Sequence, residues 1–157
     1  MSSAPAESFA ALSAALTGFR EVDLWGTGQV EPYLDVVIAT VGEAIVARLL
    51  VAADEALSSP DPRVGLQQLI LGDQDLGPVA RSLMILWYLG QWSPLPGDWR
   101  NRNGANPLDV ARVISADAYA SGLVWRAIGA HPMGADPPGY GSWANPPVVP
   151  PTQSGGA

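Results

Sequence analysis

The strongest periodic pattern in the chain lies between Tyr33 and Leu57. Apolar residues recur there at spacings of three and four, which keeps them on one stripe of a helix; they are Leu34, Ile38, Val41, Ile45, Leu49, Ala52 and Ala56. Pro32 suits the first position of such a helix, where its missing N–H has no partner to lose. We therefore predict one long amphipathic helix from Pro32 to Leu57, bent slightly at Gly42.

A shorter helix is predicted near the start of the chain, over residues 8–16. Phe9 and Leu12 fall on one side of it, and Gly18 follows as a helix stop. Residues 21–29 mix Asp, Trp and two glycines without a helical period. We predict that this second segment is a loop.

Prolines and glycines mark the boundaries in the middle of the chain. Pro60 and Pro62 remove backbone donors and should end the long helix, with a short helix following at 64–71. The turn GDQDLG comes next. We expect Asp75 in this turn to cap the following helix, because a carboxylate there can accept hydrogen bonds from free N–H groups.

That next helix, residues 79–92, is apolar on nearly all sides, so we predict that it is the buried central element. Residues 93–106 are polar and rich in proline and glycine, and are predicted to be a loop. A last helix is expected from Pro107 to about Ile128. Its inner face would be formed by Val113, Ala116, Ala120, Leu123 and Ala127.

The helical period stops after Gly129, and the remaining residues are rich in proline and glycine. The chain shows no alternating β pattern and no internal repeat. The expected class is all-α: a small helical bundle of four to five helices. We expect a helical domain over residues 1–130 and a long irregular, extended tail that docks on a partner over residues 131–157.

The composition adds that this bundle is short of charge. The 157 residues suffice for one domain, with 48% hydrophobic and 15% charged residues, whereas a typical soluble domain has about 25% charged residues. A partner chain would cover the excess apolar surface. The alternative is a compact bundle that tolerates an alanine-rich, weakly charged surface.

Charge excludes one class of partner. All eight basic residues are arginine and the net charge is −7, so we expect no nucleic-acid binding, which needs a basic patch. Only Arg100 and Arg102 lie close together. The longest apolar run, residues 83–89, is far shorter than the about 20 residues that cross a bilayer, so we expect no direct membrane insertion.

The inventory of reactive side chains points away from catalysis. The chain has no cysteine and one histidine, His131, which stands beside Pro132 with no identifiable orienting partner. We interpret it as a surface or packing residue. Gly26 and Gly28 give a G-x-G pattern, but no strand precedes it and no third glycine follows at the required place.

An acidic turn resembles the start of a calcium loop at Asp73, Asp75 and Gly77. Such a loop requires glycine at its sixth position and glutamate at its twelfth, and these places hold Pro78 and Met84. Helix capping is the better interpretation. We therefore predict no catalytic, cofactor-binding or metal-ligating residue in this chain.

Aromatic residues suggest recognition instead. Tyr140 and Trp143 stand in a proline-rich segment with too few aliphatic residues for a core of its own, so order there would come from docking. Trp92 and Trp99 flank the polar loop and fit either a core or a contact role. The predicted partner-binding residues are Trp92, Trp99, Arg100, Arg102, Tyr140, Trp143, Pro146 and Pro147.

Three stretches in order carry a resemblance. They are SFAALSAALTGF, LGPVARSLMILWYLGQW and DAYASGLVWRAIGAHPMGADPPGYGSWANPPV. Together they resemble the small subunit of the membrane-associated FAD-dependent sorbitol, fructose and glucose dehydrogenase complexes. The resemblance implies a non-catalytic chain that binds and helps to mature a large FAD-binding subunit, which holds the FAD and oxidises the sugar or polyol. A multihaem cytochrome is the further partner that it implies.

In that family the small subunit typically carries the export signal. The first twenty residues here show neither a basic start with an apolar stretch nor a twin-arginine pair. We therefore expect the location to follow the partner, periplasmic or membrane-associated with it and cytoplasmic otherwise. Two other hypotheses stay open: an independent helical adaptor or chaperone, and a small enzyme with an unrecognised carboxylate site.

Overall fold

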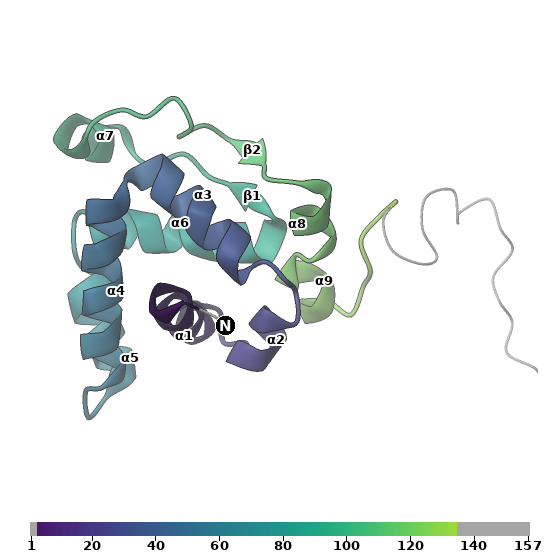
Figure 1. Ribbon diagram of the computed structural model, residues 1–157, viewed down its shortest axis with the longest axis horizontal. Coiled ribbons are helices and arrows are strands. Elements are labelled where there is room, and N and C mark those ends of the chain that lie inside the picture. Colours follow the sequence, from purple (N-terminus) through teal and green to yellow (C-terminus); the bar gives the residue numbers. More distant parts are fainter. Residues whose placement is uncertain (1–2, 135–157) are drawn as a thin grey trace, which may run out of the picture.

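Helix α1 (Ala4–Thr17) is surrounded by other helices in the computed structural model, which describes residues 3–134 (Figure 1). It contacts α2 (Glu21–Trp25), α3 (Val30–Val41), α4 (Glu43–Leu57) and α6 (Leu76–Leu89). Phe9 and Leu12 are fully buried in this contact. The helix ends at Gly18, which has φ 79° and donates its N–H to the Ala14 carbonyl. The predicted first helix and its stop are confirmed, while the loop predicted at 21–29 contains α2.

The predicted long helix is two helices. Gly42 has φ 89° and ψ 151°, a conformation that only glycine adopts readily, so α3 ends before it and α4 starts after it. The two helices meet at a sharp corner (Figure 1). Both still turn their apolar stripe to the same core, with Val37 and Leu49 fully buried. The apolar spacing therefore continues through Gly42 although the helix axis changes direction there. The prediction of a single helix was wrong.

The chain then turns back along α4 through α5 (Pro62–Leu66), which continues into a π-helical turn, η1 (Gln67–Leu71). Asp61 caps α5, because its Oδ1 accepts the N–H groups of Arg63 at 3.1 Å and Val64 at 3.2 Å. The predicted break at 58–63 is confirmed, and the short helix expected at 64–71 is present with a different second half.

Helix α6 is the buried central element that its apolar sequence predicts. Val79, Leu83 and Leu86 are fully buried, and the helix contacts α1, α3, α4 and α9 (Leu123–Ala127). Its cap differs from the prediction. Oδ1 of Asp73 accepts the N–H groups of Asp75 at 2.8 Å and Leu76 at 2.7 Å. Asp73 is the capping residue, which leaves the Asp75 carboxylate available for contacts with α7.

The residues after α6 depart most from the sequence-based picture. The chain forms β1 (Gln91–Trp92), α7 (Gly97–Asn103) and β2 (Arg112–Val113), with β1 and β2 paired antiparallel. The loop predicted at 93–106 thus contains α7. The last helix predicted from Pro107 to Ile128 is replaced by a loop, β2, α8 (Ala116–Ala120) and α9.

A helix start and a helix break within residues 107–128 explain why no single helix forms there. The Ser115 hydroxyl accepts the N–H of Ala118 at 2.9 Å and starts α8, and buried Gly122 separates α8 from α9. Of the expected inner face, Leu123 is fully buried but Val113 is 55% exposed. The all-α class is confirmed in broad terms, since the only strands in residues 3–134 are this short pair. The proposed tail, with Tyr140, Trp143, Pro146 and Pro147, lies outside the described residues.

The C-terminal end of α6 packs against both α3 and α8. The Tyr33 ring packs edge-on against Trp87 at 4.8 Å between ring centroids, and the Tyr33 hydroxyl donates to the Ala118 carbonyl at 3.4 Å. Burial raises the pKa of the Tyr33 phenol. Gly90 ends α6 with φ 66°, and a Cβ there would overlap the Ala118 carbonyl group. The return of the chain onto α6 therefore requires glycine at position 90.

We expect Gly90→Ala to lower the free energy of unfolding by at least ~2 kcal/mol, from left-handed strain and overlap with Ala118. Urea unfolding followed by far-UV circular dichroism measures this. Gly97→Ala is the matched control, because a Cβ at Gly97 would meet no atom within 4 Å. It should change the stability by no more than about 0.5 kcal/mol. Equal stability of the two variants would contradict the prediction.

Candidate partner-binding surface

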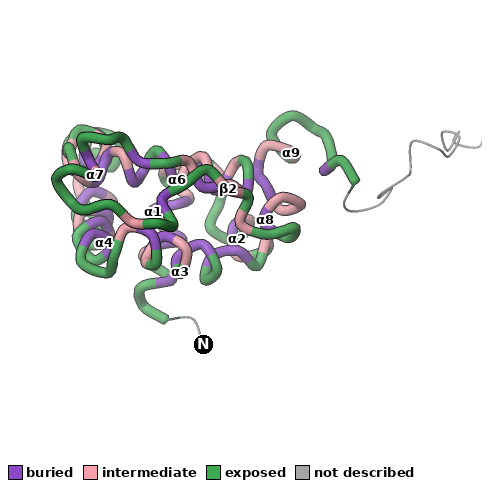
Figure 2. The backbone as a smooth tube through the Cα atoms, turned by 90° about the horizontal axis from the view of Figure 1, so that it is seen from above, coloured by how far each residue is buried: buried purple, intermediate pink, exposed green. Residues whose placement is uncertain are grey.

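Four of the predicted partner-binding residues come together between α6 and α8. Trp92 lies on β1, and Trp99, Arg100 and Arg102 lie on α7. Figure 2 views the molecule from this side, and the segment between α7 and β2 crosses the near face largely exposed. The sequence therefore placed these residues in one region, although it did not place each side chain correctly.

The structure corrects the prediction for the two tryptophans. Trp92 is 0% exposed and Trp99 is 2% exposed, so neither ring is available to a partner. The Trp92 indole Nε1 donates to Oδ1 of Asp109 at 2.8 Å, and the Trp99 Nε1 donates to the Asp75 carbonyl at 2.8 Å. A buried indole needs such an acceptor for its N–H. Both rings therefore pack beneath the exposed segment between α7 and β2 rather than face a partner.

Asp109 is the buried group that organises this region, and the sequence analysis missed it. It is 2% exposed, and its Oδ1 accepts the Leu95 N–H at 2.9 Å in addition to the Trp92 indole. Oδ2 accepts no hydrogen bond from the described residues but lies 3.9 Å from Nε of Arg100. One carboxylate thus joins β1, the loop after it and α7. The only sequence signal was a lone aspartate between Leu108 and Val110.

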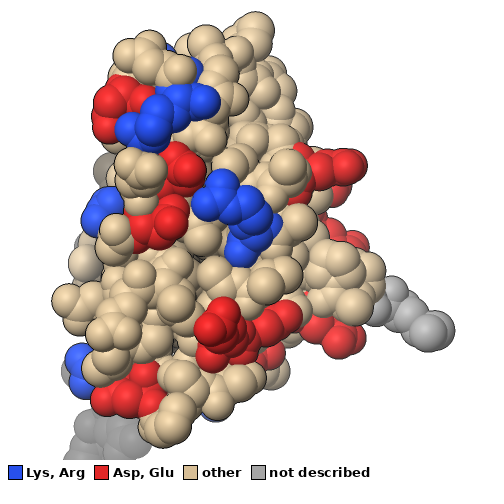
Figure 3. Space-filling model, turned by 90° about the vertical axis from the view of Figure 1, so that its left-hand side faces the viewer, with Lys and Arg blue, Asp and Glu red and all other residues tan. Residues whose placement is uncertain are grey.

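Arg102 ties the outer side of α7 to the start of α6. Its Nε lies 3.2 Å from Oδ1 of Asp75, its Nη1 lies 3.2 Å from Oδ2 of Asp98, and its Nη2 donates to the Gln74 carbonyl at 2.7 Å. Arg48 of α4 adds a longer contact of 3.6 Å to Asp75. Basic and acidic groups adjoin at the level of α7 in Figure 3, and further acidic groups lie across the lower part of the same face.

The contacts with α7 side chains lower the pKa of the Asp75 and Asp98 carboxyl groups. The Asn103 amide donates to Oδ1 of Asp75 at 3.1 Å and contributes most to the lowered pKa there, with Arg102 adding to it against the opposing effect of burial. The hydrogen bond from Arg102 is the main cause of the lowered pKa of Asp98. Arg100 and Arg102 keep 41% and 34% of their side chains exposed, so each still offers an edge to solvent.

Exposed aliphatic side chains lie on the same segment. Leu108, Val110 and Val113 are 44%, 50% and 55% exposed. The Arg112 guanidinium donates to the Leu108 carbonyl, and Arg100 approaches Asp109 between Leu108 and Val110. We call Leu108, Val110 and Val113 the aliphatic patch. The Asp109 carboxylate holds the backbone of this segment to β1 and the loop after it, and two arginines, Arg100 and Arg112, contact the segment.

Residues 3–134 contain no group of three or more His, Asp or Glu side chains placed to hold a metal ion. His131 is exposed and lines a hollow of about 240 Å³ with Trp125 and Arg126. No helix within the described part is both long and apolar enough to cross a membrane.

In comparisons with known proteins, the chain matches no family model, no curated protein and no solved structure.

We predict that Asp109→Ala lowers the free energy of unfolding by about 2–4 kcal/mol, because it leaves the Trp92 and Leu95 N–H groups buried without an acceptor. Urea unfolding followed by tryptophan fluorescence measures the loss. Asp98→Ala is the control. Its side chain is 74% exposed and its ion pair with Arg102 should contribute no more than about 1 kcal/mol. An equal effect of both substitutions would refute a structural role for Asp109.

The lowered pKa of Asp75 predicts a pH dependence. The folded protein holds the proton more weakly than the unfolded chain, whose value is near 3.8. This stabilisation is therefore full above that value and is lost as the pH falls through the lower folded pKa. Between about pH 5 and pH 2, Asp75→Asn should show a shallower fall in the free energy of unfolding than the wild type.

Asp35→Asn removes an equal charge from the exposed side of α3 and serves as the control for that measurement. If the free energy of unfolding of Asp75→Asn falls as steeply with pH as that of Asp35→Asn, the ionised Asp75 contributes nothing to the fold.

Proposed function

We propose that this chain is the non-catalytic small subunit of an FAD-dependent sugar or polyol dehydrogenase complex of the sorbitol type. It binds, stabilises and helps to mature the large catalytic subunit. In this proposal the chain binds no cofactor of its own, and the FAD lies in the partner. A cytochrome subunit would accept the electrons, and the complex would be periplasmic or associated with the membrane through the partner.

The observation that carries the proposal is the aliphatic patch on its buried frame. Interfaces commonly combine an apolar centre with a polar margin, and arginine is enriched in them. Leu108, Val110 and Val113 would supply the apolar centre, and Arg100 and Arg112 would supply part of the margin.

The fixed backbone of this segment favours binding. Asp109 ties the patch to β1 and α7, so little conformational freedom remains to be lost when a partner covers it. Trp92 and Trp99 act indirectly, by supporting the segment from below. Tyr140, Trp143, Pro146 and Pro147 remain contacts proposed from the sequence.

The identity of the partner comes from the three resembling stretches, which cover most of α1, all of α6 and the sequence from Asp117 onward. The same patch would serve an independent helical adaptor. Only the partner distinguishes the two proposals, so the decisive test supplies the large FAD-binding subunit itself.

We expect co-expression with the large FAD-binding subunit of a sorbitol-type dehydrogenase to yield a soluble, FAD-loaded complex. The large subunit alone should be insoluble or inactive. Copurification, flavin absorbance and dye-linked sugar or polyol oxidation measure the outcome. A large subunit that is equally active alone and never retains this chain would overturn the proposal.

Val110→Asp should weaken that complex at least about tenfold, since burying an unpaired carboxylate in an apolar contact is costly. The isolated chain should keep its stability, because Val110 is already 50% exposed. Val51→Asp on α4, at a residue 67% exposed, is the matched control and should bind normally. Equal binding of the two variants would move the interface away from the aliphatic patch.

A further inference from the structure

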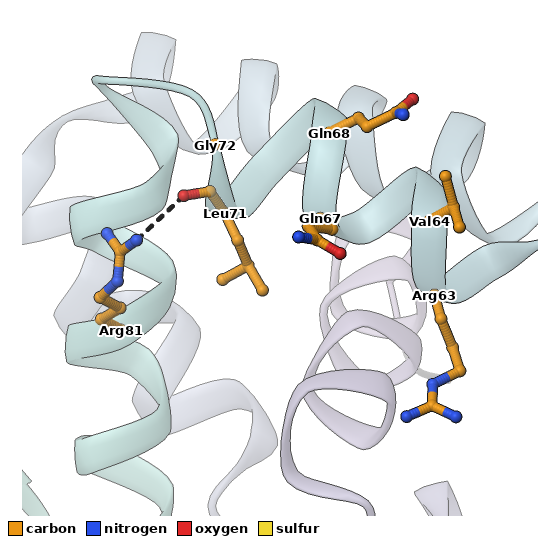
Figure 4. A pocket seen from close by; sticks show the side chains of 7 residues that line it. All are labelled: Arg63, Val64, Gln67, Gln68, Leu71, Gly72 and Arg81. Atoms are coloured by element: carbon orange, nitrogen blue, oxygen red, sulfur yellow. Dashed lines mark hydrogen bonds between the residues drawn. The ribbon is translucent and has the colours of Figure 1, made fainter.

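A second surface feature lies between α5, η1 and the first turns of α6. A groove of about 860 Å³ runs between α5, η1 and the start of α6, and is lined by Arg63, Val64, Gln67, Gln68, Leu71 and Arg81. Figure 4 shows Arg81 at one end and Arg63 at the other, with Gln67 and Leu71 between them. These side chains are exposed except for Leu71, which is half-buried. The groove is therefore open along its length.

The charge in the groove has one sign. No carboxylate lines it, and among residues 3–134 no carboxylate lies within ion-pairing distance of Arg63 or Arg81. The neighbouring Asp61 directs its Oδ1 to backbone N–H groups at the start of α5. The arginines that do pair with carboxylates lie elsewhere, and are Arg20, Arg48, Arg100 and Arg102. A chain with a net charge of −7 thus keeps two cations together at one hollow.

The groove is also preformed at one end. The Nη2 of Arg81 donates to the Leu71 carbonyl at 3.0 Å, and a Cβ at Gly77 would approach Nη1 of Arg81 to 3.1 Å. Glycine at position 77 thus leaves room for this guanidinium. The π turn closes with a bond of 2.8 Å from the Gly72 N–H to the Gln67 carbonyl. Such turns are frequent at functional sites because they alter where side chains point.

The lining selects among occupants. A small anion would leave most of an open groove of about 860 Å³ empty. Amides of Gln67 and Gln68 can both donate to and accept from an extended backbone. Val64, which is 44% exposed, and Leu71 offer apolar contact between the two cations.

We propose that this groove receives an extended acidic segment of the large subunit, with carboxylates paired to Arg63 and Arg81 and an aliphatic side chain on Val64 and Leu71. This inference rests on the proposed function for the source of the segment. Figure 1 shows the start of α5 at the end of α4 that is far from α7.

The test in the complex is Arg63→Glu. A glutamate in the first turn of α5 suits the helix dipole, so the chain should fold normally. Its affinity for the large subunit should fall about tenfold. Arg126→Glu on α9 changes the net charge equally at another exposed site and should bind like the wild type. If both variants bind like the wild type, or weaken alike, the groove inference is overturned while the proposed function stands.

A second measurement uses the chain alone. With eight arginines and no lysine, its arginine side chains give few Nε–Hε resonances to assign. Titration with a blocked Glu-Leu-Glu-Leu peptide should shift the resonances of Arg63 and Arg81, and the Gln-Leu-Gln-Leu peptide should not. If the wild-type chain never retains the large subunit, the proposed function fails, and this titration decides the groove separately. Absent shifts, or equal shifts at all arginines, would overturn acidic-segment binding there.

Discussion

The buried carboxylate of Asp109 is the constraint on which the second half of the structure depends. Its oxygen accepts the Trp92 indole and the Leu95 amide, and its charge is opposed by Arg100. A charged group in the interior is tolerated only where hydrogen bonds and an opposite charge compensate for lost water. That compensation requires β1, the following loop and α7 to stay together. Asp109 turns inward between Leu108 and Val110, and these two residues of the aliphatic patch stay exposed.

The parts of the fold that were predictable are those with strong local signals. Apolar periodicity identified α1 and α6, and Pro60 and Pro62 marked the end of α4. Gly42 was recognised as unusual, but a helical stripe continues through a corner when both helices face one core. The prediction of one helix from Pro107 to Ile128 was wrong, because alanine-rich spacing there resembles that of a helix. The contacts that position this segment come from Tyr33 and Gly90, which are distant in the sequence.

The candidate surface shows the same limit. The sequence could group Trp92, Trp99, Arg100 and Arg102 in one region, because they are close along the chain. It could not show that both indoles turn inward, since that depends on acceptors at Asp109 and Asp75. It also assigned Val113 to an inner face, although a two-residue strand leaves this side chain exposed. Supporting residues and contact residues differ here only by orientation, which composition and spacing do not encode.

The π turn η1 has a consequence for how this chain tolerates changes of length. A π turn accommodates one residue more than the α-helical turn it replaces, so Gln67–Leu71 can be viewed as a one-residue insertion in a continuous helix. Deleting one residue there would restore α-helical bonding and rotate the preceding side chains by about 100° relative to those after it. Arg63 would then no longer line the end of the groove opposite Arg81. Related chains that use both arginines to line the groove should therefore conserve the length of residues 67–71 more strictly than their identities.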